Sequence, residues 1–366
     1  MSELAKTIEQ KKSQFSKKGP QAMTETTNQR RPRAILRDVA QEVSLSVSAV
    51  SMALKDHPRI GAATKARVRE AADRLGYVTN SAGRALRAQT AGAIAVIVPN
   101  TGAHVFGHAY FMRVMTGVTK AANSRDSLVF ISTSSEPGNS VSAYEAIMRS
   151  RAADGAIVTS ASVDDTNIGR LVETGMPVVL LGRFPHLPHA VTVGVDDVAA
   201  AFRATEHLIL QHGRRSLVHI SGPLRHQSAI DRRDGFLAAA AKHGAEGIVI
   251  EGDFSEESGV AAIESLGANA PAQFGLFAAN DEMAYGALTT LQSAGISVPR
   301  DVSLVGFDDF GLSRVTSPSI TTMSVPAERM AQIAAEKLYD LVDGNPIDEV
   351  HVVLPVELTI RKSCGC

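Results

Sequence analysis

The sequence predicts an α/β protein in which a small helical unit precedes a larger body of parallel β-sheets. Short apolar segments alternate with amphipathic helical segments over residues 93–307, as in sheets whose strands are joined by helices. Three segments of helical periodicity come before them, within residues 37–75. The charge divides at the same place, because residues 1–90 hold 17 Lys and Arg against 8 Asp and Glu, whereas residues 91–366 hold 20 against 30.

The helical unit is expected to contain three helices, over residues 37–43, 46–54 and 62–75. Ser46 can cap the second helix with its hydroxyl group, and Gly76 can end the third in a left-handed conformation. The apolar residues are spaced to bury one face of each helix and to form one shared core: Val39, Ala40, Val43, Leu45, Val50, Leu54, Val68, Ala71 and Leu75.

The second of these helices is typical of a helix-turn-helix, whose second helix enters the major groove of DNA. Ala40 is small enough for the first two helices to cross closely there, and short side chains follow at Val47, Ser48, Ala49 and Ser51. The concentration of Lys and Arg in this part of the chain suits contact with phosphates. A purely structural three-helix bundle with solvated charges is the alternative.

The larger body is expected to form two lobes, each a doubly wound parallel sheet. Apolar strands covered by helices on both faces are typical of such sheets, and their ligands bind in a crevice at the carboxyl ends of the strands. The expected strands are residues 93–98, 128–132, 155–159, 178–181, 217–221, 248–251, 275–278 and 302–307.

Several classes of protein are disfavoured. No apolar run approaches the roughly 18 residues of a membrane span, and residues 1–33 are polar and basic, so we expect a disordered basic tail, no membrane association and a cytoplasmic location. No dinucleotide-binding, phosphate-loop or nucleophile-elbow motif is present, so we expect neither an enzyme nor a cofactor. The two cysteines, Cys364 and Cys366, supply too few ligands for structural zinc, and we expect a frayed, reduced tail.

Residues 36–87 resemble the DNA-binding headpiece of the lactose/galactose repressor (LacI/GalR) family without a gap. The matching stretches are RDVAQEVSLSVSAVSMAL and AATKARVREAADRLGYVTNSAGRAL. Two positions depart from the family pattern. Ile35 stands where a capping Thr is usual, and Ser44 stands where Gly or Asn often eases the turn, so both are expected to cost stability.

The resemblance implies how the headpiece contacts operator DNA. Base-reading positions correspond to Val47, Ser48 and Met52, and phosphate contacts to Ser46, Ser51 and Asn80. Met52 cannot donate a hydrogen bond, so it offers only apolar contact, for example to a thymine methyl group. A hinge helix over residues 81–88 would place Leu86 as a wedge in the minor groove, with Arg87 beside it.

From Ala93 to about Lys362 the chain resembles the type I periplasmic-binding-protein fold of this family's effector domains. The motifs are VVLLGR, VGVDD, HISGP, RRDGF, FAANDEMAYGAL and DVSLVGFDD. Three crossovers between the lobes are implied near Asp196, Met323 and Leu354. The implied domains are 34–79 for DNA binding, 80–90 for the hinge, and 91–366 for effector binding and dimerisation.

The same resemblance implies a set of effector-binding residues between the lobes: Tyr110, Phe111, Asp196, Ser228, Arg232, Phe277, Asn280 and Asp308. Each has a simpler alternative. Asp308 could cap the following segment, Phe277 could belong to the core, and Arg232 could pair with Asp231 or Asp234. His104 and His108 are expected in a long loop over residues 100–109, and not as metal ligands.

These expectations favour a transcriptional regulator, most simply a repressor. It would bind double-stranded operator DNA as a homodimer on an inverted repeat, under the control of a small-molecule effector. A sugar is the favoured effector, and the aromatic pair Tyr110 and Phe111 keeps a nucleobase as the second candidate. A transport receptor would share the larger domain, but would need an export signal and would lack the basic headpiece.

Overall fold

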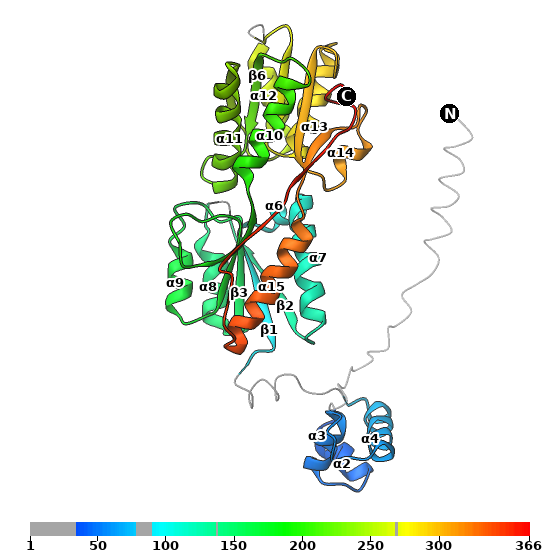
Figure 1. The fold of residues 1–366 in the computed structure, drawn as a ribbon. Coiled ribbons are helices and arrows are strands. Elements are labelled where there is room, and N and C mark those ends of the chain that lie inside the picture. Colours follow the sequence, from blue (N-terminus) through cyan, green and yellow to red (C-terminus); the bar gives the residue numbers. More distant parts are fainter. Residues whose placement is uncertain (1–33, 78–89, 137, 268–269) are drawn as a thin grey trace, which may run out of the picture. The chain divides into compact units, whose positions relative to one another are not determined.

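The computed structural model describes residues 34–77, 90–136, 138–267 and 270–366, which fall into two compact units, one within residues 1–80 and one within 81–366. Figure 1 shows the elements of each unit. No helix among these residues is both long and apolar enough to cross a membrane. The tail over residues 1–33 and the hinge over residues 81–88 fall outside the described residues.

The smaller unit contains α2 (Leu36–Glu42), α3 (Val47–Leu54) and α4 (Ala62–Leu75), which confirms the three expected helices. Each helix packs on the other two around a core that includes Val39, Val50 and Val68, all fully buried. The expected core residue Leu75 is instead 37% exposed, and Tyr77 packs against the core in the segment that follows. Ser46 caps α3, and Gly76 ends α4 with a φ of 63°.

The first lobe of the larger unit is a parallel sheet in the order β11-β5-β4-β3-β1-β2. Its strands are β1 (Ala93–Thr101), β2 (Leu128–Ser134), β3 (Gly155–Thr159), β4 (Val178–Leu181), β5 (Val191–Val195) and β11 (His351–Leu354). The helices of this lobe are α6 (Gly102–Gly107), α7 (Ala109–Asn123), α8 (Val141–Ser150), α9 (Asn167–Glu173) and α15 (Ala327–Asp343). In Figure 1, α7 and α15 run together along one side of the lobe, and α8 and α9 lie on the other.

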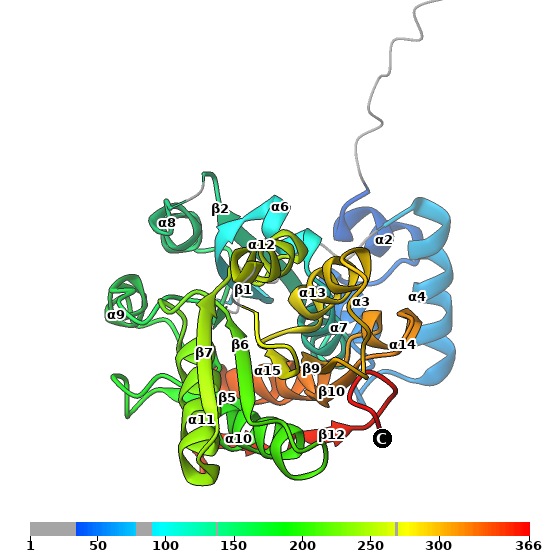
Figure 2. The ribbon, with the colours of Figure 1, turned by 90° about the horizontal axis from the view of Figure 1, so that it is seen from above.

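The second lobe repeats this arrangement in the order β12-β10-β9-β8-β6-β7, with β12 antiparallel to β10. Its strands are β6 (Ser216–Ser221), β7 (Glu246–Glu251), β8 (Phe274–Ala278), β9 (Val302–Asp308), β10 (Thr321–Ser324) and β12 (Glu357–Thr359). The helices are α10 (Asp197–Leu210), α11 (Gln227–His243), α12 (Glu256–Leu266), α13 (Asp281–Ser293) and α14 (Leu312–Val315). Seen from above in Figure 2, β6 and β7 run beside α11, which packs against α10.

The chain crosses between the two sheets three times: after β5, after β10 and after β11. Four strands were missing from the sequence prediction: β5, β10, β11 and β12. Apart from β5, they are short strands of three or four residues, and β11 and β12 lie at the sheet edges, so none of these three carries a long apolar run. The long loop expected over residues 100–109 is also wrong, because β1 continues to Thr101 and α6 follows it.

Candidate DNA-binding surface and ligand cavity

The face of α3 that the sequence assigned to DNA is turned outward. Val47 and Ser48 are exposed and Ser51 and Met52 are partly exposed, whereas Val50 lies in the core. The Ser46 hydroxyl accepts a hydrogen bond from the Ala49 N–H at 3.1 Å, which satisfies one free donor of the first turn. The remaining expected contacts, Asn80, Leu86 and Arg87, lie outside the described residues.

Both departures from the family pattern have a visible local consequence. Ser44 adopts a φ of 53°, a left-handed conformation that disfavours any side chain. At the start of α2, the Asp38 carboxylate accepts from the Ile35 N–H at 2.8 Å, but Ile35 has no side-chain oxygen with which to return the bond. Only one half of a capping box is therefore formed.

The basic residues of the headpiece differ in whether an acidic side chain pairs with them. Lys65 and Arg69 both pair with Asp56, at 3.2 and 2.9 Å, and these bonds lower the pKa of that carboxyl group. By contrast, Arg37, Lys55 and Arg59 are exposed and form no ion pair with any residue that the structure describes. Sequence reasoning did not single out these three side chains, which have charge available for phosphates.

A cavity of about 150 Å³ opens between the two lobes at the carboxyl ends of their strands. Six of the eight residues expected there line it: Tyr110, Phe111, Ser228, Arg232, Asn280 and Asp308. Others were not singled out as effector-binding residues by the sequence: His104, His108, Arg183, Phe184, Asp197, His226, Gln227, Phe254 and Glu282. Several of these hydrogen-bond across the cleft, so contacts between distant segments would have been needed to find them.

Arg232 is held in the wall of the cavity by a buried ion pair. Its Nε donates to Asp197 at 2.7 Å, a terminal nitrogen donates to the Ala279 carbonyl at 2.5 Å, and its guanidinium lies 3.7 Å from the centre of the Phe307 ring. Gly235 lets α11 approach this closely, because a Cβ there would lie 2.2 Å from the Val198 carbonyl oxygen of α10. The pairing partner is thus Asp197, and not Asp231 or Asp234.

Asp308 is the carboxylate of the cavity with the weakest pairing. Its nearest cation is Arg232 at 3.8 Å, and its side chain accepts no hydrogen bond from any described residue. Burial raises its pKa well above the ordinary value, against the opposing effect of Arg232. A buried acceptor that faces a cavity without a donor is suited to a ligand hydroxyl or amide group.

A chain of hydrogen bonds joins the lobes at one end of the cavity. Asn280 caps α13 by accepting from the Met283 N–H and donates to Glu282 at 2.8 Å. Glu282 also bonds His108 of the first lobe at 3.0 Å, and this bond raises the pKa of His108. Burial lowers the pKa of the neighbouring His104 to about 4.

A second bridge between the lobes joins Arg183, after β4, to Asp231 of α11 at 2.7 Å. The aromatic pair on α7 contributes to the wall beneath, where the Tyr110 hydroxyl is hydrogen-bonded to Thr159 at 3.1 Å and burial raises its pKa to about 12. The rings of Tyr110 and Phe111 meet edge to face, with centres 5.2 Å apart.

Two expected pocket residues lie elsewhere. Phe277 is fully buried in the second lobe and stacks on His219, with ring centres 4.7 Å apart, so it belongs to the core. Asp196 caps α10 by accepting from the Ala199 N–H at 2.9 Å, and the next residue, Asp197, occupies the cavity. The turn into α10 determines which of the two acidic neighbours faces inward.

Comparison with known proteins agrees with both units. Residues 35–80 match the family described as bacterial regulatory proteins, lacI family, and residues 205–364 match the periplasmic binding protein-like domain. The transcriptional regulator CelR of Thermobifida fusca is 30% identical over 340 residues, which cover 92% of this chain and 99% of CelR. The transcriptional regulator GalS of Salmonella typhimurium is 31% identical over 327 residues, covering 87% of this chain and 94% of GalS.

Solved structures show the same fold. A CelR–cellobiose complex aligns with a TM-score of 0.70 and 28% identity, covering 91% of this chain and all of CelR. A lac repressor dimer bound to operator aligns with a TM-score of 0.80 at 23% identity, covering 91% and 99% of the two chains. With a helix-turn-helix unit and a two-lobed binding domain aligned along nearly the whole length of such relatives, the protein belongs to the lacI family of DNA-binding transcriptional regulators, which are not enzymes.

Proposed function

We propose that this regulator is a cytoplasmic repressor that binds an inverted-repeat operator as a homodimer and responds to a neutral sugar. The outward face of α3 supports the DNA-binding part of the proposal, with Val47, Ser48 and Met52 reading bases and Ser46 and Ser51 contacting phosphates. By resemblance, Asn80 adds a phosphate contact, and Leu86 and Arg87 act in the minor groove.

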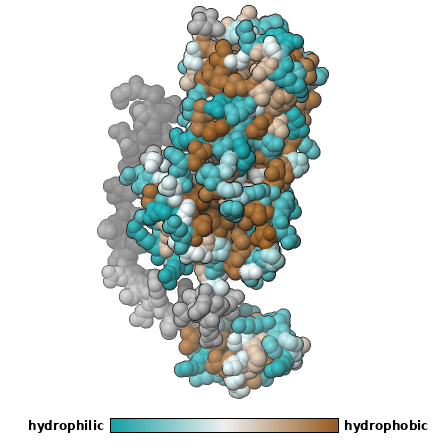
Figure 3. All heavy atoms as spheres, turned by 60° about the vertical axis from the view of Figure 1, so that its left-hand side comes forward, coloured by the Kyte–Doolittle hydropathy of each residue, from teal (hydrophilic) through white to brown (hydrophobic). Residues whose placement is uncertain are grey.

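The larger unit offers surface for a partner. Apolar side chains gather on the face of this unit that Figure 3 presents. Independently, β2 is the edge strand of its sheet and exposes Leu128, Phe130 and Ile131 at 58, 40 and 41%. An edge strand with apolar side chains is a site of association in proteins, which favours a dimer over a monomer.

Asp308 is the observation on which the sugar assignment rests. The other acidic groups around the cleft already have cationic partners: Asp197 has Arg232, Glu282 has His108, and Asp231 has Arg183. The cavity therefore carries little unpaired positive charge with which to bind an anion. A carboxylate acceptor beside aromatic rings suits a neutral ligand with hydroxyl groups.

A nucleobase is the second candidate, and the geometry of the aromatic pair disfavours it. A flat base gains most from rings that lie parallel to it, whereas Tyr110 and Phe111 meet at an interplanar angle of 71°. Among the similar solved structures, one is a complex of CelR with cellobiose, a disaccharide.

A thermal-shift screen tests the assignment, because a ligand that binds only the folded protein raises its melting temperature. The screen should include cellobiose, its monosaccharide glucose, polyols and purines, each with the native protein and with Asp308→Asn. We expect a sugar to stabilise the native protein, with a smaller shift for the variant. A purine that stabilises both proteins equally would contradict the sugar assignment. Selection of binding sites from random DNA tests the proposed operator, because the selected sequences should form an inverted repeat.

A further inference from the structure

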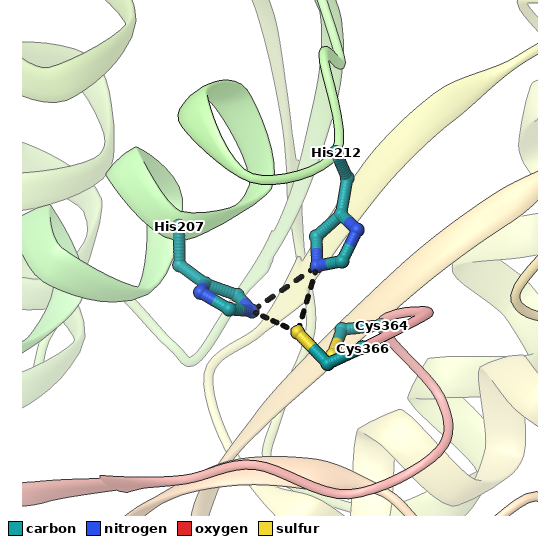
Figure 4. Close-up of side chains that lie close together, drawn as sticks. All are labelled: His207, His212, Cys364 and Cys366. Atoms are coloured by element: carbon teal, nitrogen blue, oxygen red, sulfur yellow. Dashed lines mark hydrogen bonds between the residues drawn. The ribbon is translucent and has the colours of Figure 1, made fainter.

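Four side chains with metal-binding atoms meet in the second lobe, away from the cavity. His207 lies in the last turn of α10, His212 in the loop after it, and Cys364 and Cys366 in the segment that follows β12 (Figure 4). The four ligand atoms all lie within 4.8 Å of one another. The two imidazole Nε2 atoms are 3.2 Å apart. The Cys366 Sγ lies 3.5 Å from the His212 Nε2 and 3.7 Å from the His207 Nε2.

These separations match the edges of a tetrahedron around zinc. Bonds of roughly 2.0–2.1 Å to nitrogen and 2.3 Å to sulfur, at tetrahedral angles, place two nitrogens about 3.3 Å apart and a nitrogen and a sulfur about 3.6 Å apart. Two thiolates and two imidazoles are also a common ligand set of structural zinc sites. Without a metal, the two facing Nε2 atoms can share only one proton between them.

The surrounding structure holds the cysteine segment in place and corrects the expectation of a frayed tail. Cys364 is fully buried, and the Thr321 hydroxyl of β10 donates to its sulfur at 3.1 Å. The Ser363 hydroxyl bonds both β9 and β10, and the Ser363 backbone bonds Leu304 of β9 and Ser319. Gly365, with a φ of 107°, provides the turn between the two cysteines, which only one residue separates. The Thr321 hydroxyl resembles the outer-shell partners that orient metal ligands.

We propose that His207, His212, Cys364 and Cys366 form a closed, four-coordinate zinc site. Binding removes one proton from each thiol, so that two thiolates and two neutral imidazoles coordinate the ion. The site joins the segment after β12 to the end of α10, the helix that begins at the cavity residue Asp197. Sequence reasoning found only the two thiols, because the histidines lie about 150 residues earlier in the chain.

The test is metal binding by the full-length protein, purified under reducing conditions. We expect one zinc per chain by elemental analysis. After chelation, cobalt should give the visible absorption of a tetrahedral thiolate-bound ion, and zinc should abolish it. Changes of outer-shell partners cost roughly 10- to 100-fold in metal affinity, so loss of a ligand in Cys366→Ser or His212→Gln should weaken zinc binding by at least about 100-fold. His189→Gln, an exposed histidine outside the cluster, is the matched control.

Circular dichroism establishes whether each variant is folded, and Cys366 is exposed, so its replacement by Ser leaves the core intact. Zinc should raise the melting temperature of the native protein and of His189→Gln, but not of Cys366→Ser or His212→Gln. The proposal is overturned if the reduced protein binds no zinc, or if the ligand variants bind it as tightly as the control. A purified protein whose mass shows a Cys364–Cys366 disulfide that persists under reducing conditions would also overturn it.

Discussion

Replacing Arg232 by Ala should destabilise the second lobe strongly. The side chains of Arg232 and Asp197 are 10 and 8% exposed, and one charged hydrogen bond of 2.7 Å joins them. Removal of the arginine leaves the Asp197 carboxylate buried without its cation, and breaking a buried pair in this way costs about 3–5 kcal/mol. Burial already raises the pKa of Asp197 while Arg232 opposes the rise, so the variant should also gain stability as the pH falls and this carboxyl group is protonated.

Urea unfolding at several pH values measures the effect, and two variants serve as controls. Arg233→Ala removes the neighbouring pair with Asp234, whose side chains are 30 and 49% exposed, and should cost at most about 1 kcal/mol. The double variant Asp197→Leu with Arg232→Leu removes both charges together and should recover most of the loss. If Arg232→Ala is as stable as Arg233→Ala, the ion pair does not hold the wall of the cavity.

Substitution of Asp308, unlike that of Arg232, should weaken effector binding without destabilising the protein. Asp308 has no hydrogen-bond donor among the described residues and a raised pKa, so its ionised form opposes folding, and Asp308→Asn should not destabilise the protein. The loss of its contact with a ligand hydroxyl should cost about 1–3 kcal/mol, or roughly 5- to 150-fold in effector affinity. Urea unfolding measures the stability, and operator titration with and without effector measures the effector affinity. If Asp308→Asn responds to effector at wild-type concentrations, Asp308 does not contact the effector.

Four further results are expected. Ser44→Gly should relieve the left-handed turn by about 0.5–1 kcal/mol and raise the amide protection of α3 about 2- to 5-fold in hydrogen exchange; unchanged protection would argue against strain there. The bond to Glu282 raises the pKa of His108 above 6.5, so the stabilising effect of this inter-lobe pair should be complete below that pH and disappear as the pH rises through the raised value. The melting-temperature difference between the native protein and His108→Gln should therefore shrink at alkaline pH, and a constant difference would contradict the ion pair. Leu86→Ala should weaken operator binding more than random-DNA binding, and Met52→Arg should shift one base of each half-site towards guanine, as DNA selection would show.

The sequence predicted elements whose signal is local. The strands β3 and β4 carry continuous apolar runs, and their observed limits equal the predicted ones. The short strands β10, β11 and β12 depend on partners from distant parts of the chain, so their own residues do not reveal them. In the headpiece, periodicity predicted Leu75 as a core residue, but the helix ends at Gly76 and leaves that side chain partly exposed.

Among the site residues, too, those with a local signal could be predicted and those that depend on other parts of the structure could not. Asn280 and Asp308 stand at the ends of parallel strands, and such ends meet at one edge of a sheet, so their place beside the cavity could be predicted. The choice between Asp196 and Asp197 could not be, because it depends on where α10 begins. An acidic residue at the N-cap bonds the first turn, and its neighbour is then free to turn towards Arg232.

The histidine and cysteine cluster shows why distance along the chain limits such reasoning. The cluster has two halves, a pair of histidines at the end of a helix and a pair of cysteines in a tail. Neither pair alone indicates a metal site, because each supplies only two of the four ligands. The halves meet because β12 pairs with β10, and Ser363 then fixes the next residues against β9 and β10. That pairing brings Cys364 beside Thr321 and places both sulfurs opposite α10. A change that loosens the tail without touching a ligand, such as Ser363→Ala, should therefore weaken metal binding as well.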